Sequence, residues 1–156
     1  MAGFIVRADD RRVRRRLYAL QDALLDLRPA LTNAANELTR RMRLRFSFKR
    51  DPDGARWRPW AKSTAEQRKR EGRGTLMLYT KATRDQSRFV PGKREIRAVL
   101  GTPYAKYHEQ PDGAGGRLAR RAFMFSRRNG GRSLAKGDEA YLLNALRYQL
   151  RKAAAQ

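Results

Sequence analysis

Residues able to perform acid–base or metal chemistry are few and scattered in this 156-residue chain. It has no cysteine and a single histidine, His108, which excludes disulfides, thiolate zinc sites, cysteine nucleophiles and paired-histidine metal sites. The closest acidic pair within a loop, Asp51 and Asp53, flanks a proline and is explained more simply by turn chemistry than by catalysis. His108 stands beside Glu109 and is expected to be a structural hydrogen-bonding residue rather than a general base. We therefore predict no catalytic residue, no metal site and no cofactor.

Two other kinds of enzyme site also fail on spacing. The glycine-rich stretch 112–116 lacks the G-x-x-x-x-G-K-[ST] spacing of a phosphate-binding loop, and no strand leads into it. A small nuclease would need a metal site that the acidic residues do not visibly supply. The sequence thus favours a binding or structural protein.

Positive charge is the dominant chemical property of the chain. Lys and Arg number 37 against 15 Asp and Glu, which gives a formal net charge of +22. Basic and acidic residues number 13 and 5 in 1–50, 13 and 6 in 51–100, and 11 and 4 in 101–156, so the folded body itself must be positive. Self-repulsion of this size destabilises a compact monomer unless an anionic partner or a large assembly lies nearby. Phosphate backbones are the commonest such partner, and a purely solubilising surface is the alternative.

The densest cationic cluster follows Asp9 and Asp10, at the start of the first expected helix. Because the positive end of the helix dipole disfavours cations there, packing rather than local electrostatics should hold this segment helical. The cluster is either a solvated face or a contact for phosphate or an acidic partner. The candidate contact residues are Arg11, Arg12, Arg14, Arg15 and Arg16, together with Arg40 and Arg41 further along the chain.

Two consecutive amphipathic helices are expected in residues 1–50, which form a helical N-terminal arm. Apolar residues recur at steps of four and three, as one helix face requires. Pro29 suits the first turn of the second helix, so the break belongs near Arg28, and the pair forms a helical hairpin or one bent rod. The first face comprises Val13, Leu17, Leu20, Leu24 and Leu27, and the second Leu31, Ala35, Leu38, Met42 and Phe46.

Turn signals and aromatic residues mark the segment after these helices. Asp51-Pro52-Asp53-Gly54 predicts a tight turn. Trp57 is expected in the core, while Trp60 is either pinned to the core or offered to a partner. Ser63 and Glu66 form a capping-box pattern that predicts a short helix over about 64–71, and the apolar run 75–79 is of ambiguous type.

The second half of the chain predicts a small antiparallel sheet and a final helix. Phe89-Val90, a Pro91-Gly92 turn and alternating residues up to Leu100 indicate a β-hairpin. A further strand is expected within 117–126, a short helix after Thr102-Pro103, a loop at 129–131 and a C-terminal helix along Leu143, Leu146 and Leu150. The predicted fold class is α+β, with long N-terminal helices, a small antiparallel sheet, short connecting helices and a C-terminal helix. Residues 1–156 are predicted to be a single domain, in which 51–126 is the core and 127–156 is a loop and helix.

Three motifs keep order and spacing across about 46–126. They are Phe46 followed by Asp51-Pro52-Asp53-Gly54-x-x-Trp57-x-Pro59, then Gly101-Thr102-x-Tyr104-Ala105-x-x-His108, then Arg121-Ala122-Phe123-Met124. Together they resemble the phage virion morphogenesis family, the tail-completion proteins of Mu-like and P2-like bacteriophages. The matched residues, expected to be structural, are Trp57, Pro59, Gly101, Thr102, Tyr104, Ala105, His108, Arg121 and Phe123.

This sequence departs from the family pattern at several places within the motifs. Thr80-Lys81 replaces the usual Thr-Gly, Thr83 a leucine and Ala122 a proline. Glu109-Gln110-Pro111 replaces a glutamine-aromatic-glycine run. These departures bear on loop geometry and interface detail.

The resemblance implies a non-enzymatic structural protein of the virion, at the head–tail junction, which joins or caps the tail as part of a ring. The implied partners are other copies of the chain, head–tail connector and tail proteins, and packaged DNA in the lumen. A ring around the DNA route would explain the uniform charge through sequence-independent phosphate contacts, while docking onto acidic neighbours is the alternative.

The compartment and a rival function follow from the same features. No stretch approaches the roughly 20 apolar residues that span a bilayer, and residues 1–12 lack the apolar run of a secretory signal, so we expect no membrane partner and synthesis in the host bacterial cytoplasm. The rival is an autonomous basic nucleic-acid-binding protein of ribosomal or nucleoid type. It predicts tight, salt-sensitive binding by the isolated monomer.

Overall fold

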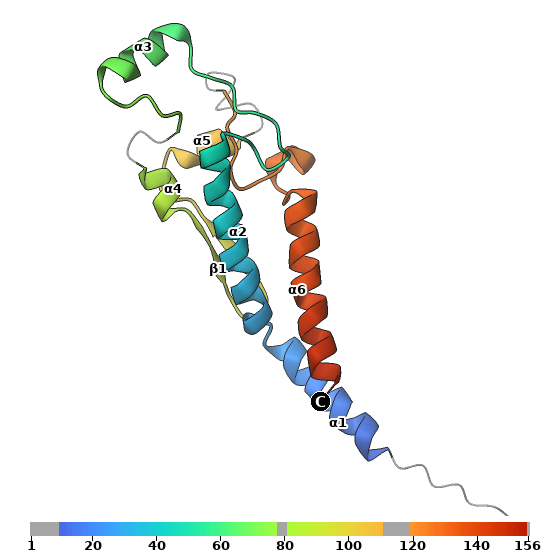
Figure 1. Ribbon diagram of the computed structural model, residues 1–156. Coiled ribbons are helices and arrows are strands. Elements are labelled where there is room, and N and C mark those ends of the chain that lie inside the picture. The colour runs from blue at the N-terminus through green and yellow to red at the C-terminus, as the bar shows by residue number, and fades with distance from the viewer. Residues whose placement is uncertain (1–9, 78–80, 111–118, 156) are drawn as a thin grey trace, which may run out of the picture.

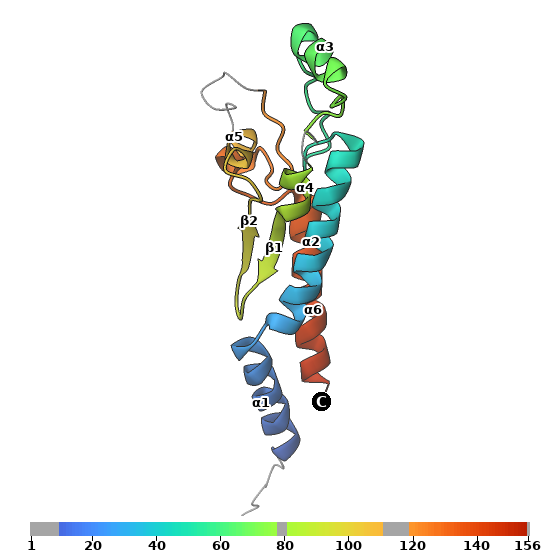
Figure 2. The ribbon, with the colours of Figure 1, turned by 90° about the vertical axis from the view of Figure 1, so that its left-hand side faces the viewer.

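The computed structural model describes residues 10–77, 81–110 and 119–155 of a mostly helical, elongated molecule (Figure 1). Two long helices, α2 and α6, lie side by side and run in opposite directions, and a two-stranded antiparallel hairpin covers another face of α2 (Figure 2). The elements are α1 (Arg11–Leu25), α2 (Arg28–Phe48), α3 (Lys62–Arg70), α4 (Ala82–Gln86), β1 (Arg88–Pro91), β2 (Ile96–Val99), α5 (Ala105–Glu109), η1 (Arg128–Gly131) and α6 (Lys136–Ala154).

The two predicted N-terminal helices are confirmed, and together they form a bent rod rather than a hairpin (Figure 1). Extended backbone at Asp26 ends α1, and Pro29 lies in the first turn of α2, as its fixed φ favours. The Leu27 N–H donates to the Lys93 carbonyl at 2.9 Å, which fastens the bend to the tip of the hairpin. Beyond the bend, α1 lies beside the C-terminal part of α6 (Figure 1).

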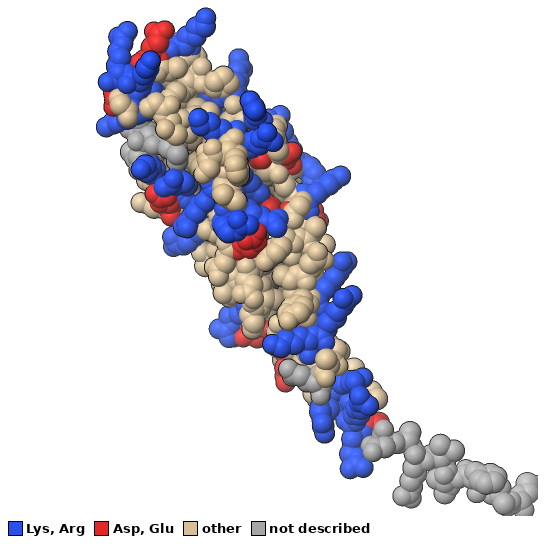
Figure 3. Space-filling view, in the orientation of Figure 1, with Lys and Arg blue, Asp and Glu red and all other residues tan. Residues whose placement is uncertain are grey.

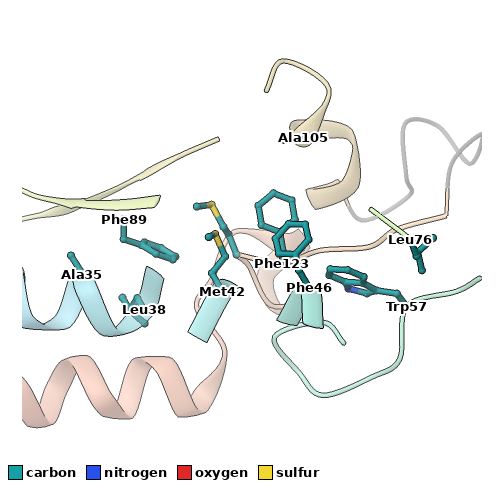
Figure 4. Packing of buried hydrophobic residues seen from close by; sticks show 10 residues of the cluster. Ala35, Leu38, Met42, Phe46, Trp57, Leu76, Phe89, Ala105 and Phe123 are labelled. Carbon is teal, nitrogen blue, oxygen red and sulfur yellow. The ribbon is translucent and has the colours of Figure 1, made fainter. Parts of the chain in front are cut away.

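The core is organised around the predicted apolar face of α2. Leu38, Met42 and Phe46 are buried along that face, and Phe89 of β1 lies over its Ala35–Leu38 end (Figure 4). Phe46 packs edge-on against Trp57, with ring centroids 5.3 Å apart at 83°, and its centroid lies 4.9 Å from that of Phe123. Edge-to-face contacts of this kind stabilise aromatic clusters beyond simple burial. Trp57 is therefore a core residue, as expected.

The predicted hairpin is confirmed, with Phe89 opposite Ala98 and the Gly92 N–H donating to the Glu95 carbonyl at 2.8 Å. The Thr39 hydroxyl joins the hairpin to α2, because it donates to the Ala35 carbonyl at 2.8 Å and accepts the Phe89 N–H at 3.0 Å.

The predicted strand within 117–126 is wrong. Its described residues, 119–126, contain no strand, although Phe123 and Met124 are fully buried. The N–H groups of Phe123, Met124 and Phe125 donate to the Glu109 carboxylate instead of to a neighbouring strand. Only Ser126 makes an isolated bridge, to Ser133.

The short helices differ from expectation in detail. The predicted helix at about 64–71 is present as α3, but its N-cap is Ala61 without a side-chain cap, and Ser63 lies inside the helix. The short helix after Pro103 is α5, and the C-terminal helix is α6. Helix α4 was not expected. The glycine-rich stretch 112–116, residues 78 and 79 of the ambiguous apolar run, Asp9 and Arg117 lie outside the described residues.

Candidate interaction surfaces

The first and third sequence motifs meet in space and hold each other. The Trp57 indole Nε1 donates to the Ala122 carbonyl at 2.9 Å. The Arg121 guanidinium donates through Nε to the Arg58 carbonyl at 2.9 Å and through Nη2 to the Pro59 carbonyl at 3.2 Å. Burial lowers the pKa of Arg121, and the charge of Arg58 acts in the same direction. These side chains thus tie two loops together around the buried Phe123.

The second motif is a close-packed joint between β2 and α5. A Cβ on Gly101 would lie 2.6 Å from the Gln86 Cβ and 2.7 Å from the Ser87 backbone nitrogen, so only glycine fits. The Gly101 N–H donates to the Ser87 hydroxyl at 2.9 Å. The Thr102 hydroxyl lies 2.9 Å from that of Thr83, the residue that replaces the leucine of the family pattern.

The remaining residues of the second motif have different surroundings. Ala105 is fully buried, whereas Tyr104 is 48% exposed and lies outside the core. Burial lowers the pKa of His108, and the nearby Arg121 charge adds to this, while a hydrogen bond to the Ala119 backbone opposes it. A neutral, half-buried imidazole is suited to the structural role expected for His108.

Glu109 is a structural residue that the sequence reasoning missed. Its Oε1 accepts the N–H groups of Phe123 at 2.8 Å and Met124 at 2.9 Å, and its Oε2 accepts that of Phe125 at 3.1 Å. Burial raises the pKa of Glu109, and these three N–H donors only partly oppose that effect. One feature of the sequence could have identified this role: Glu109 stands where the family shows glutamine, whose side-chain carbonyl accepts the same kind of hydrogen bond.

Three further acidic residues form hydrogen bonds or ion pairs within the chain. Asp138 is 3% exposed in the first turn of α6 and pairs with Arg45 and, at 3.4 Å, with Arg41 of α2. Asp51 accepts the backbone N–H groups of Asp53 at 3.1 Å and Ala55 at 2.8 Å. The Asp51–Asp53 pair is therefore explained by turn chemistry.

The Asp53 carboxylate fastens that turn to the segment before η1. It accepts the Ser126 hydroxyl at 2.7 Å and the Arg127 N–H at 2.8 Å. Desolvation is the largest influence on the pKa of Asp53, yet the hydrogen bonds and nearby arginines together lower it. With these carboxylates used internally, Lys and Arg predominate among the charged side chains on the face that Figure 3 shows.

The seven predicted contact arginines divide into two groups. Arg11, Arg12, Arg14, Arg15 and Arg16 are all exposed on α1, where Arg14 pairs with Asp10 at 2.6 Å. Arg40 and Arg41 lie half-way along α2 and both pair with Glu37, whose pKa they lower to about 2. The Arg41 guanidinium also lies 4.7 Å from the ring centre of Tyr141. The structure therefore gives Arg40 and Arg41 internal contacts and does not bring them to the α1 cluster.

Helix α1 also carries an uncovered apolar face. No residue of α1, which the structure describes in full, is buried. Val13, Leu17 and Leu24 of the predicted seam are 58%, 59% and 52% exposed, and the adjacent α6 leaves Leu143 and Tyr148 45% and 70% exposed. We call Val13, Leu17 and Leu24 the arm seam.

Among residues 10–77, 81–110 and 119–155, no group of three or more His, Cys, Asp or Glu side chains is placed to hold a metal ion. The helices within those ranges are each too short or too polar to cross a membrane.

Comparison with known protein families places the chain in one of them. The model of the phage virion morphogenesis family matches residues 8–130, from the start of the arm to η1. No curated protein and no solved structure matches the chain.

Proposed function

The chain belongs to the phage virion morphogenesis family, and from this membership we propose that it acts at the head–tail junction, where it completes or caps the tail and joins it to the head as one member of a ring. In this role it works through protein contacts and catalyses no reaction. It is made in the host cytoplasm and becomes part of the virion. Its partners are further copies of itself and the connector and tail proteins on either side.

The arm seam is the observation that carries this proposal. Fully burying one leucine or valine side chain contributes roughly 1.5–3 kcal/mol, yet three such residues of α1 stay more than half exposed. Together with Leu20 and Leu27 these residues recur at steps of four and three, which is typical of a seam that packs against another helix. A neighbouring subunit in a ring would supply the missing cover.

The charge distribution supports assembly close to DNA. Exposed arginines on α1 can contact phosphates without reading sequence, which permits a duplex to slide through a ring. The same side chains can instead meet acidic surfaces of connector or tail proteins. In either case the anionic neighbour relieves part of the self-repulsion that a net charge of +22 creates.

Electron microscopy of particles assembled without the protein tests the joining role. We expect full heads and separate tails, and rescue when the wild-type chain is supplied. The double variant Leu17→Ser/Leu24→Ser should fail to rescue, because it removes the seam while leaving the core untouched. Leu44→Ser, which changes a 37% exposed leucine at the other end of α2, is the matched control and should rescue. Normal virions in the absence of the protein would contradict the proposal.

The exposed arginines of α1 also favour the rival, an autonomous nucleic-acid-binding protein. The two functions differ in the behaviour of the isolated chain. The rival predicts tight duplex binding whose log affinity falls against log salt with a slope of about −0.9 per phosphate contacted. The joining role predicts weak binding by the free chain and assembly into rings, which sedimentation analysis would detect.

A further inference from the structure

A hollow of about 970 Å³ is lined by the C-terminal end of α2, the segment 56–60 and residues of the segment from α3 to Leu76. These parts of the chain lie at the end of the molecule opposite α1 (Figure 1). Its apolar walls include Phe48, Trp57, Trp60 and Leu76. Trp57 and Leu76 are buried at the base, Trp60 is half-buried, and Phe48 is 67% exposed. An aromatic side chain this exposed beside a concave apolar surface is typical of an anchor point for a partner.

Three cations surround this hollow: Lys49, Arg50 and Arg56. An isolated antiparallel bridge places Arg50 directly opposite Arg56, on the two sides of the Asp51–Gly54 turn. Like charges directly opposite each other are destabilising. All three side chains are exposed, and within the described part of the chain no ion pair joins any of them to an acidic side chain. An anionic partner would turn this repulsion into attraction.

We propose that the hollow docks an acidic segment of a neighbouring virion protein, which inserts an apolar or aromatic side chain beside Phe48 and Trp60 and places carboxylates near Arg50 and Arg56. The proposal rests on the joining role, because it names the chemistry of one partner. A further copy of this chain fits this site poorly, because its acidic side chains such as Glu37, Glu109 and Asp138 are already paired within its own fold. Duplex DNA offers phosphates to the cations but no projecting apolar group for the hollow, whereas protein interfaces combine aromatic anchors with arginine.

Intrinsic fluorescence gives a direct test, because both tryptophans of the chain line the hollow. The probe is a synthetic peptide with a central Leu-Phe pair flanked by Asp and Glu, titrated into the full-length protein. We expect saturable binding with a shift of tryptophan emission to shorter wavelength. The twin peptide with Ser-Ser at its centre should bind about tenfold more weakly, as loss of a buried anchor predicts.

Substitutions around the hollow locate the site. Phe48→Ser should weaken binding of the Leu-Phe peptide about tenfold, and its exposure means that folding should survive. Arg50→Gln/Arg56→Gln should also weaken binding and flatten its salt dependence. The matched controls lie on α6, far from the hollow, and should bind as wild type does: Tyr148→Ser and Arg147→Gln/Arg151→Gln.

Three results would overturn the site. They are equal binding of the two peptides, unchanged binding by the hollow variants, or a duplex oligonucleotide that produces the same emission shift and loses it in Phe48→Ser, which would assign the hollow to nucleic acid. The particle experiment separates the two proposals. Rescue of joining by wild type alongside absent peptide binding overturns only the hollow, whereas normal virions without the protein overturn the joining role.

Discussion

Helices α1 and α2 carry apolar residues at nearly the same spacing, yet this apolar face is buried in α2 and largely exposed in α1. The apolar face of α2 is buried against β1, Trp57 and Phe123 and forms the core, whereas α1 lies beside α6 and leaves Val13, Leu17 and Leu24 more than half exposed. The difference teaches that helical periodicity identifies the face that needs cover without identifying what covers it. In α2 the rest of the chain provides that cover, and in α1 we infer that a partner does.

The charged residues divide in the same way. Around the core, carboxylates are buried and each has named donors, as Glu109 and Asp138 show. On α1 the five arginines are exposed, and Arg14 pairs with Asp10, the N-cap residue of the helix. Around the core, therefore, acidic side chains are paired within the fold, whereas the arginines of α1 are exposed to solvent and to partners.

The sharpest way to break this comparison is to truncate one side chain from each helix. Phe46→Ala should lower the free energy of unfolding by about 3–5 kcal/mol, because it removes a ring that touches both Trp57 and Phe123. Leu17→Ala on α1 should change it by less than about 0.5 kcal/mol, since the side chain is 59% exposed. Denaturant unfolding of the isolated chain measures both. Equal losses would show that α1 is as integral to the fold as α2.

Removing a carboxylate from each region should give the next largest difference. Asp138→Asn leaves the Arg45 guanidinium, whose side chain is 11% exposed, without its charge partner and should lower the unfolding free energy by about 3 kcal/mol. Asp10→Asn breaks the exposed pair with Arg14 and should lower it by less than about 1 kcal/mol. The comparison would fail if thermal unfolding gave similar shifts for both variants.

Two glycines sharpen the distinction between close-packed and open sites. Gly101→Ala should lower the unfolding free energy by about 1–3 kcal/mol, because its Cβ would press on the Gln86–Ser87 backbone. Gly137→Ala on α6 meets nothing within 4 Å and should instead raise it by up to about 1 kcal/mol, as helix propensity predicts. The two midpoints of denaturant unfolding should therefore move in opposite directions. A stabilising Gly101→Ala would contradict the close approach of Gly101 to the backbone of Gln86 and Ser87.

The smallest expected effect is on pH dependence, where the contributions of Glu37 and Glu109 should differ in sign. Arg40 and Arg41 lower the pKa of Glu37 to about 2, so its contribution is present above the ordinary pKa near 4.5 and is lost as the pH falls towards 2. Burial raises the pKa of Glu109, so its protonation begins earlier in the folded state, and acidification through that raised pKa favours folding.

Unfolding free energies across this pH range, with Glu37→Gln and Glu109→Gln as references, test these signs. Relative to Glu37→Gln, the wild type should lose less than about 1 kcal/mol between pH 4.5 and 2, since the pair is partly exposed. Relative to Glu109→Gln, it should gain stability on mild acidification. Identical profiles for the wild type and both variants would refute the assigned causes.

Local patterns identified much of this fold correctly. The two N-terminal helices, the break near Arg28, the buried face of α2, the Asp51–Gly54 turn and the hairpin of β1 and β2 all follow from short-range periodicity and backbone preference. The family motifs were also readable, because residues such as Gly101 are dictated by contacts within their own neighbourhood.

Long-range hydrogen bonds account for the errors. Phe123-Met124-Phe125 has the composition of a strand, but a short apolar run does not reveal where its N–H groups find acceptors. The acceptor is Glu109, 14 residues earlier than Phe123. Arg41 is likewise predicted to be a surface contact residue. It instead contacts Asp138 and Tyr141, which belong to α6 at the far end of the sequence.

By itself, then, the sequence determined that the chain is cationic throughout, cysteine-free, built from long helices with a small antiparallel hairpin, and similar to one phage family, because these properties depend on composition and on neighbours along the chain. The tertiary structure decided which acidic residues lie inside, which apolar seam is covered, and that Phe48 and Trp60 share a hollow with Arg50 and Arg56. Those outcomes depend on which distant segments pack together, and burial, hydrogen bonding and charge pairing are all set by that packing.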